Sequence, residues 1–299
     1  MIIKPTCYFE ASARTRIAKL VDPDSFTEIC PPQLRHTSPH LARLNAPVAF
    51  DDGAIVGRAL LAGHQILIAS QEGKFNGGAV GEVHGAKLCG LLARAIRERP
   101  VAVLLLADSG GVRLHEANAG LIAIAELMRA VLRTQAEGIP VIALIGGSCG
   151  AFGGMGIVSG LCTEVIISEQ GRIGLSGPEV IETVKGVDEF DSRDRALVWR
   201  ITGGKLRRAL GDATRLVDDD IASFRSATAE LLDKQCAHPL KALTLADLSE
   251  AHHHLSVRAQ RYDTARDGRV IFQEAGFEDL EGVALMPVDA FNRQIEGTP

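Results

Sequence analysis

The sequence of 299 residues has few aromatic residues, no long apolar run and no excess of basic charge. Aromatic side chains make up 4% of the chain, so its core must be mostly aliphatic. A formal net charge of -5 offers no basic surface of the kind that nucleic acid requires. No apolar stretch approaches the ~20 residues of a membrane span, and the N-terminus lacks a signal-peptide pattern. We therefore expect a cytoplasmic globular protein without nucleic acid or membrane as a partner.

Cysteine is sparse, and the common cofactor motifs are missing. The six cysteines form no C-x-x-C pair, and most lie in apolar runs, which is typical of reduced, buried thiols. No G-x-x-x-x-G-K-[ST], G-x-G-x-x-G after a strand, or H-E-x-x-H occurs. His252–His254 stand beside Glu250 in a polar helical pattern, which favours a solvated face over a metal site. We expect no metal.

Glycine is abundant, with 31 residues placed among alternating strand and helix patterns. Apolar runs predict antiparallel hairpins within 48–70 and buried strands within 101–111, 139–147 and 163–170. Periodic apolar positions predict helices within 81–99, 118–138, 150–162, the end of 171–186, and 219–235. Asn118 is the expected N-cap and Gly138 the expected stop of one helix. Alternating strands and helices indicate an α/β fold with parallel strands and right-handed crossovers.

The two ends of the chain are less regular than this middle part. Residues 1–47, rich in Pro and His around 30–40, predict an irregular N-terminal arm. Residues 48–238 form the predicted domain, with no convincing buried strand after residue 170. Residues 239–299 predict a helix followed by extended chain, a C-terminal tail.

Two predicted parallel strands both end in Gly-Gly, at Gly110–Gly111 and Gly146–Gly147. The carboxyl ends of such strands are where open α/β sheets bind ligands. Glycines there expose backbone N–H groups, which can hold an oxyanion, and losing one such donor typically costs ~3–4 kcal/mol of transition-state stabilisation. A tight turn or close helix packing explains a single Gly-Gly pair about as well. Two pairs and the further glycines up to residue 160 favour a binding role.

The segment GGSCG (146–150) also fits G-x-S-x-G, the turn that presents a nucleophilic serine. A serine hydrolase using Ser148 therefore stays open as an alternative. It needs an acid and a histidine downstream, and no local context selects among Asp188, Asp191, Asp212, His238 and His252–His254.

Three ordered segments resemble the carboxyltransferase branch of the crotonase-like superfamily. FNGGAVGEVHGAKL (75–88) resembles F-M-G-G-S-M-G-x-V-x-G-E-K, and DSGGVRLHEANAG (108–120) is similar to S-G-G-A-R-M-Q-E. The stretch 146–182, GGSCGAFGGMGIVSGLCTEVIISEQGRIGLSGPEVIE, resembles the family's G-G-V-(x)-A-S-F…D…I-A-E-P-x-A-x-I-G-F-A-G-P-x-V-I-E. Together with SFTEICPPQLRHTSPHL (25–41), the wording is most similar to the β subunits of biotin-independent malonate decarboxylases.

The resemblance implies a crotonase-like spiral of ββα units with a helical C-terminal extension. It implies a carboxy-lyase, active as a hetero-oligomer in which a homologous γ subunit faces this chain. The substrate would be a malonyl thioester on the phosphopantetheine-type, dephospho-CoA-derived arm of an acyl-carrier subunit, and the products an acetyl thioester and CO₂. No biotin, no metal and no covalently bound cofactor is implied. Such a decarboxylation needs an electron sink at the thioester carbonyl but no nucleophile.

The resemblance also assigns residues, motif by motif. The backbone donors that would stabilise the enolate are those of Gly110, Gly111, Val112, Gly147 and Ser148. The substrate-binding positions would be Gly77, Gly78, Gly153, Gly154 and Arg113. Arg113 would steer the substrate carboxylate, although a plain surface charge explains an arginine there equally well.

A biotin-dependent acyl-CoA carboxyltransferase β subunit is the main alternative within the same branch. The chain lacks the four-cysteine zinc ribbon of acetyl-CoA carboxylase β subunits, and it has no biotin-attachment motif. Both departures favour the biotin-independent decarboxylase.

Overall fold

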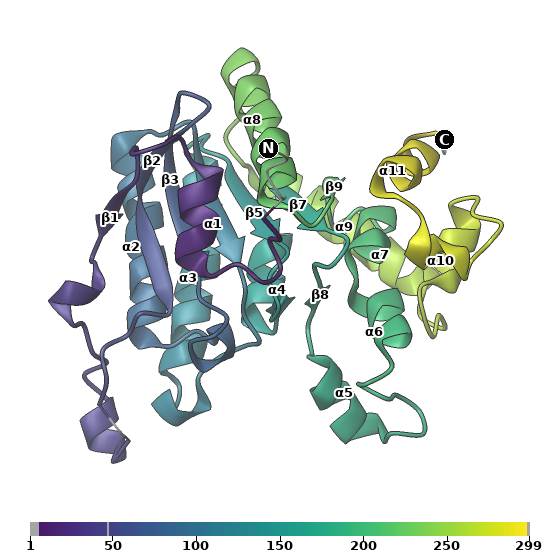
Figure 1. The fold of residues 1–299 in the computed structure, drawn as a ribbon, viewed down its shortest axis with the longest axis horizontal. Coiled ribbons are helices and arrows are strands. Elements are labelled where there is room, and N and C mark those ends of the chain that lie inside the picture. The colour runs from purple at the N-terminus through teal and green to yellow at the C-terminus, as the bar shows by residue number, and fades with distance from the viewer. Residues whose placement is uncertain (1–5, 47, 298–299) are drawn as a thin grey trace.

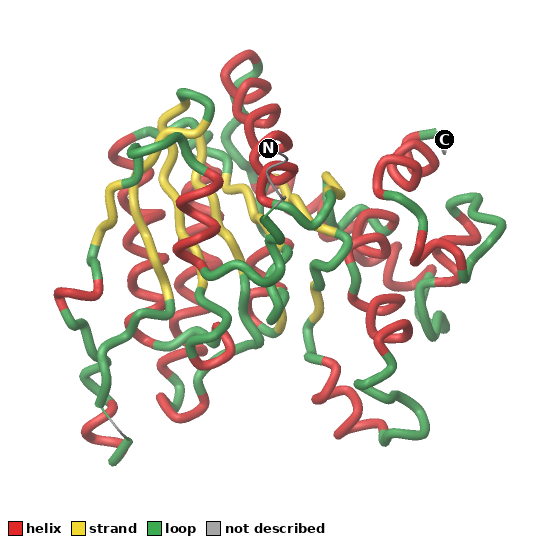
Figure 2. The backbone as a smooth tube through the Cα atoms, in the orientation of Figure 1, coloured by secondary structure: helices red, strands yellow, loops and turns green. Residues whose placement is uncertain are grey.

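The computed structural model describes residues 6–46 and 48–297, and a seven-stranded sheet forms its centre (Figures 1 and 2). The strand order is β1-β2-β3-β4-β5-β7-β9. The first three strands pair antiparallel: β1 (Thr27–Ile29), β2 (Ala54–Leu61) and β3 (His64–Gln71). From β3 onward the pairing is parallel, through β4 (Ala102–Ala107), β5 (Val141–Ile145), β7 (Glu164–Ser168) and β9 (Arg215–Val217).

A second, small parallel sheet lies at the carboxyl end of these strands. It contains β6 (Ala151–Phe152) and β8 (Ile173–Gly174), and the bridges Val80–Val112 and Ser109–Ala151 continue the same pattern. Each unit therefore runs from a long strand to a short extended segment and then to a helix, as in β5-β6-α4 (Gly154–Gly160) and β7-β8-α5 (Pro178–Lys185). This repeat is the ββα unit of the expected crotonase-like spiral.

Helices cover both faces of the large sheet. On one face lie α1 (Ala13–Leu20) and α8 (Ile221–Ala237), and on the other α2 (Glu82–Glu98) and α3 (Ala119–Ala136) (Figure 1). Because side chains alternate along a strand, β4 contributes Leu104 to the first face and Leu105 to the second. All six residues of β4 are buried, as the continuous apolar run predicted.

The remaining helices follow β8 and form a separate group at one side of Figure 1. They are α6 (Arg195–Thr202), α7 (Gly204–Ala209), α9 (Leu245–Arg261), α10 (Arg269–Glu274) and α11 (Val288–Glu296). Short 3₁₀ turns connect elements throughout: η1 (Pro32–Leu34), η2 (Leu41–Leu44), η3 (Asn76–Gly78), η4 (Leu114–Glu116) and η5 (Gly282–Leu285). Phe272, Phe277 and Phe291 pack ring against ring and anchor the last helices.

Three expectations about the ends of the chain are wrong. The N-terminal segment is not irregular throughout, because α1 packs on the sheet and β1 pairs with β2. The tail is not extended after α9, because α10 and α11 are helices with buried aromatic residues. A strand does follow residue 170: β9 pairs with β7, but its three residues are too short to give a visible pattern.

The local predictions in the middle of the chain are mostly confirmed. The hairpin β2–β3 turns at Ala62 and Gly63, both with positive φ. Gly138 ends α3 with φ +74, whereas Asn118 precedes that helix without a capping side-chain hydrogen bond. Within the ranges described above, no helix is long and apolar enough to cross a bilayer.

Candidate active site

The predicted glycine segments meet at the carboxyl ends of β4 and β5. Ser109 N donates a hydrogen bond to Gly150 O (2.7 Å), so the chain after β4 runs beside the chain before β6. A Cβ atom built on Gly153 would lie 3.5 Å from the Cα of Gly111. Gly110 N donates to Gly77 O (2.9 Å), which brings in the third segment. The convergence inferred from the sequence is therefore present.

Not every predicted backbone donor is free. Gly110 N is bonded to Gly77 O, and Gly153 N donates to Leu175 O (3.0 Å). Gly111 N is 3.3 Å from the hydroxyl oxygen of Ser109. Because neighbouring carbonyl and hydroxyl oxygens accept hydrogen bonds from these amides, the predicted donor set must be reduced.

The amides of Val112, Gly147, Ser148 and Gly154 have no hydrogen-bond partner in the described part of the chain. Ser148 is exposed, Val112 and Gly154 are half-buried, and Gly147 is buried. The first three belong to the predicted catalytic set. These amides are the donors that the geometry leaves for an oxyanion.

A buried carboxylate explains why residue 147 is glycine. Asp108, only 2% exposed, accepts a hydrogen bond from Cys149 N (2.7 Å). A Cβ on Gly147 would lie 2.2 Å from the carboxyl carbon of Asp108, so no larger residue fits without a shift. Burial raises the pKa of Asp108, although Arg16 pulls it in the opposite direction. Asp108 thus holds the turn after β5 in place.

The partner of this carboxylate comes from the N-terminal segment. Arg16 on α1 is 1% exposed and donates to Asp108 Oδ2 (2.9 Å) and to Tyr8 O (3.1 Å). Its guanidinium also stacks on the Tyr8 ring, 4.8 Å from the centroid. Sequence analysis missed this residue. The available signal was its position on the same helix face as Ala13 and Leu20, which is otherwise apolar.

The buried side chain of His84 is linked through Gln71 to the backbone of Asp108. Gln71 Oε1 accepts a hydrogen bond from Asp108 N (3.1 Å), and Gln71 Nε2 lies 2.9 Å from His84 Nε2. The Gln71 amide therefore donates to His84, which leaves the proton of the neutral ring on Nδ1, without a partner. Burial lowers the pKa of His84 to about 3, so this ring stays neutral.

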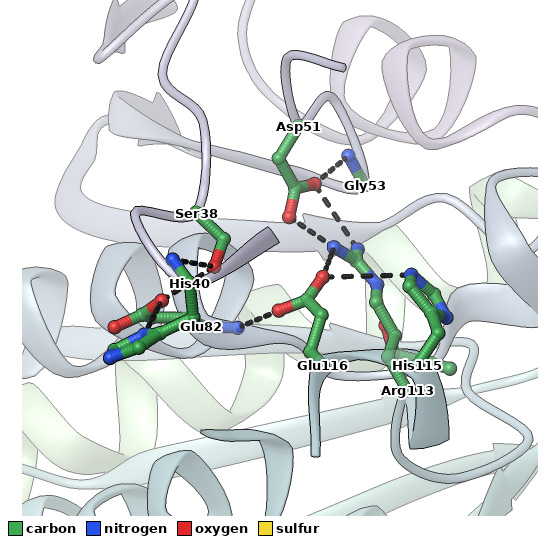
Figure 3. A network of polar contacts seen from close by, with 9 residues as sticks. Ser38, His40, Asp51, Gly53, Glu82, Arg113, His115 and Glu116 are labelled. Carbon is green, nitrogen blue, oxygen red and sulfur yellow. Dashed lines mark hydrogen bonds and ion pairs between the residues drawn. The ribbon is translucent and has the colours of Figure 1, made fainter. Parts of the chain in front are cut away.

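Arg113 is buried, contrary to the predicted role in steering a substrate carboxylate (Figure 3). It binds both carboxylate oxygens of Asp51, one of them at 3.1 Å, and Oε1 of Glu116 at 3.2 Å. Its Nε donates to Ala79 O (2.9 Å). Burial alone would lower the pKa of Arg113. The neighbouring carboxylates of Asp51 and Glu116 together have the larger effect, so the pKa of Arg113 is raised. With all three guanidinium nitrogens bonded within the protein, Arg113 positions the glycine segment 109–112 instead.

The same network reaches helix α2 and the N-terminal segment (Figure 3). Glu116 Oε2 accepts a hydrogen bond from Glu82 N (2.8 Å), where α2 begins. The Glu82 carboxylate accepts from Ser38 Oγ (2.6 Å) and lies 2.8 Å from His40 Nδ1. Four segments far apart in sequence are therefore fixed relative to the residues that follow β4.

The serine hydrolase alternative finds no catalytic base. Ser148 is exposed, and within 6–46 and 48–297 no histidine or carboxylate forms a hydrogen bond with its hydroxyl. Asp212 pairs instead with Arg207 and Arg258. His254 lies near Glu250 on the exposed helix α9. A nucleophilic serine needs a base within hydrogen-bond reach, which this arrangement lacks.

Metal-binding geometry is likewise missing from the described residues. Among them, no group of three or more His, Cys, Asp or Glu side chains could hold a metal ion. His252–His254 are exposed, as expected of a solvated helix face. All six cysteines are free. Their apolar surroundings predicted mostly buried thiols, but five of the cysteines are half-buried and Cys236 is exposed.

Comparison with known proteins decides the family. The model of the carboxyl transferase domain matches residues 10–201. The chain belongs to the carboxyl transferase family. The fold predicted from the three motifs is confirmed, because the structural neighbours are crotonase-fold carboxyltransferases and malonate decarboxylase subunits.

Relatives of this carboxyl transferase cover nearly its whole length. It is 38% identical over 302 residues to the malonyl-S-ACP:biotin-protein carboxyltransferase MADC of Malonomonas rubra, covering 96% of this chain and 95% of that protein. A Pseudomonas malonate decarboxylase hetero-tetramer, solved with malonate, contains a chain with 37% identity and a TM-score of 0.74. That match covers 97% of both chains. The Pseudomonas MdcD-MdcE hetero-dimer gives 36% identity and a TM-score of 0.64 over 82% of this chain and 94% of that one.

Proposed function

We propose that this chain is the β-type subunit of an enzyme that decarboxylates a malonyl thioester carried on the phosphopantetheine-type arm of an acyl-carrier subunit. The meeting of the two glycine segments carries the proposal, since Gly111 Cα lies 3.5 Å from the position of a Cβ on Gly153. Similarity to MADC and to the Pseudomonas malonate decarboxylase over almost the whole chain supports the malonyl group as substrate.

The chemistry follows from where charge develops. Loss of CO₂ from a malonyl thioester leaves an enolate, whose negative charge rests on the thioester oxygen. Backbone donors fixed in advance stabilise that charge, and one donor is typically worth about 10²–10³ in kcat. The unpartnered amides of Val112, Gly147, Ser148 and Gly154 are the groups this chain can offer. Because no side chain attacks the substrate, backbone amides suffice at these positions.

Exposed apolar side chains flank the site, which supports a second subunit. Leu114, Ile157 and Leu175 follow or flank the glycine segments and are 85%, 45% and 71% exposed. Exposed apolar side chains gathered around a site mark protein contacts. A homologous γ subunit packed on this face would exclude water and could supply the proton that converts the enolate to an acetyl thioester. The hetero-tetramer and hetero-dimer neighbours support a multi-subunit enzyme.

A second candidate is carboxyl transfer to a biotin protein. The name of the Malonomonas rubra relative describes that reaction, and its 38% identity to this chain is close to the 37% of the Pseudomonas decarboxylase. Both reactions pass through the same enolate, so the glycine geometry serves either one. They differ in where the carboxyl group goes after it leaves the thioester.

The deciding experiment follows CO₂ from the assembled enzyme. The chain is co-expressed with its presumed γ subunit, malonyl thioester of the carrier is supplied, and CO₂ release is measured with and without avidin. We expect release that avidin does not change. Inhibition by avidin would favour the biotin-linked reaction, and no release from a correctly assembled complex would overturn the decarboxylase proposal.

Ser148→Ala separates the proposal from the hydrolase. This variant keeps the backbone amide of residue 148 and removes only the hydroxyl. Decarboxylation should stay within about fourfold of wild type, whereas removal of a serine nucleophile costs on the order of 10⁶. A loss approaching that size would show that the hydroxyl reacts.

A further inference from the structure

A second polar cluster lies at the opposite end of the large sheet, around the exposed thiol of Cys236. Cys236 belongs to the last turn of α8, and Asp233 precedes it by three residues on the same helix. His64 begins β3, at the amino end of the parallel strands whose carboxyl ends carry the glycine segments. Cys236 Sγ lies 3.6 Å from His64 Nδ1, and His64 Nε2 lies 2.8 Å from Asp233 Oδ1.

The carboxylate determines which ring nitrogen can act as a base. An ionised aspartate only accepts hydrogen bonds, so Nε2 of His64 carries the proton that is donated to Asp233. The neutral ring then has its lone pair on Nδ1, and that atom faces the thiol. The S–H group of Cys236 therefore donates to His64 Nδ1, which is the direction of proton transfer that produces a thiolate.

Each member of the cluster has a defined task. His64 takes the thiol proton, and Asp233 orients the ring and stabilises the resulting imidazolium. The His64 side chain is 21% exposed, so the ring is held against the protein while the thiol remains open to solvent. The two ring nitrogens point to different partners, which excludes chelation of one metal ion by all three side chains.

Four of the other five cysteines, Cys7, Cys89, Cys149 and Cys162, are in unfavourable surroundings for reaction. Burial raises the pKa of Cys162 to about 12 and that of Cys89 to about 11. Burial also raises the pKa of Cys149 and of Cys7, and a neighbouring aspartate adds to each effect. Because the thiolate is the reactive form, these four thiols should react slowly at neutral pH.

We propose that Cys236, with His64 and Asp233, is a thiol-modification site that exchanges with low-molecular-weight disulfides. The thiol proton passes to His64 Nδ1, and the thiolate attacks one sulfur of the disulfide RSSR. The Cys236–S–SR bond forms, the RS–SR bond breaks, and RS⁻ leaves and takes up the proton. An exposed thiol beside a base is open to small disulfides in solution. The site does not depend on the proposed decarboxylase function.

The test measures how fast the full chain reacts with 5,5′-dithiobis(2-nitrobenzoate), a small disulfide whose leaving thiolate is coloured. We expect a fast phase of one thiol that mass mapping assigns to Cys236 and that Cys236→Ser removes. At pH 6–7, His64→Gln should slow this phase by about tenfold or more, since it removes the base. Asp233→Asn should slow it less, because the ring remains but loses its fixed orientation.

Glu230→Gln provides the matched control, since Glu230 is an exposed acid one turn before Asp233 on the same helix. It should leave the fast phase unchanged. Equal rates in wild type and His64→Gln would overturn the proposal, as would a fast phase mapped to another cysteine. An equal slowing by Glu230→Gln and Asp233→Asn would also overturn it, because general surface charge would then explain the rate. Circular dichroism spectra and thermal midpoints of the variants show whether each has kept its fold.

Discussion

The two glycine segments look alike in sequence, but buried side chains of opposite charge hold them in place. The segment after β4, residues 109–112, is held by a buried cation, Arg113, between Asp51 and Glu116. The turn after β5 is held by a buried anion, Asp108, which is neutralised by Arg16. Both supports are almost fully buried, and both join residues far apart along the chain.

This difference determines which amides remain for chemistry. In the first segment, the amide of Gly110 donates to Gly77 O, and the amide of Val112 remains free. In the second, the carboxylate of Asp108 takes the amide of Cys149 and leaves those of Gly147 and Ser148. A Gly-Gly pair therefore allows another backbone segment to approach closely. The buried charged side chain next to the pair determines which backbone amides stay free of intramolecular hydrogen bonds.

The largest expected effect on stability comes from removing Arg113, the buried cation that holds the first glycine segment. Arg113→Met leaves the carboxylates of Asp51 and Glu116, 5% and 3% exposed in their side chains, without a cation. Removing one partner of a buried ion pair costs about 3–5 kcal/mol in the free energy of unfolding, measured by urea denaturation. Arg97→Met, at an exposed position on α2, should cost less than about 0.5 kcal/mol. A small loss for Arg113→Met would show that the network does not hold the segment.

A somewhat smaller effect is expected at the second support, where only one carboxylate loses its partner. Arg16→Met should cost about 3 kcal/mol, because the Asp108 carboxylate is left buried and unpaired. Adding Asp108→Asn removes that charge while keeping an acceptor for Cys149 N. The double variant should therefore be more stable than Arg16→Met alone. Additive losses in urea denaturation would contradict a direct coupling between the two side chains.

The sequence predicted the parts of this site that follow from local patterns. Continuous apolar runs located β4 and β5, and glycine pairs directly after them located the converging segments. Helical periodicity located α2 and α3, whose bounds agree with the predicted ranges. These features depend on neighbours within a few residues, so one sequence is enough to infer them.

The supports depend on contacts that a linear pattern does not contain. Arg16 and Asp108 are 92 residues apart, and Arg113 and Asp51 are 62 apart. The sequence does not reveal the distant partners of an isolated arginine, so the family resemblance assigned Arg113 to the substrate carboxylate and a surface charge was the alternative. The three-residue strand β9 and the six-residue helix α10 were missed because such short elements carry little periodicity. Helix α11 was overlooked although its apolar residues Val288, Phe291 and Ile295 follow helical spacing.

The smallest expected effect is the difference in stability cost between alanine substitutions at Gly147 and at Gly111, whose surroundings differ. A Cβ on Gly147 would meet the Asp108 carboxylate at 2.2–2.4 Å, so Gly147→Ala should cost about 1–3 kcal/mol through overpacking. At Gly111 nothing lies within 4 Å, and only its φ of +148 opposes a side chain. We expect Gly111→Ala to cost about 1 kcal/mol from backbone strain alone.

A double variant identifies the cause of that difference. If the carboxylate forces glycine at position 147, shortening it with Asp108→Ala makes room, and Gly147→Ala then adds little further loss. Gly111 has no such partner, so Asp108→Ala should leave the cost of Gly111→Ala unchanged. Urea denaturation of the four combinations measures both couplings. A coupling at Gly147 with none at Gly111 would mean that one Gly-Gly pair is required by a buried charge and the other only by backbone conformation.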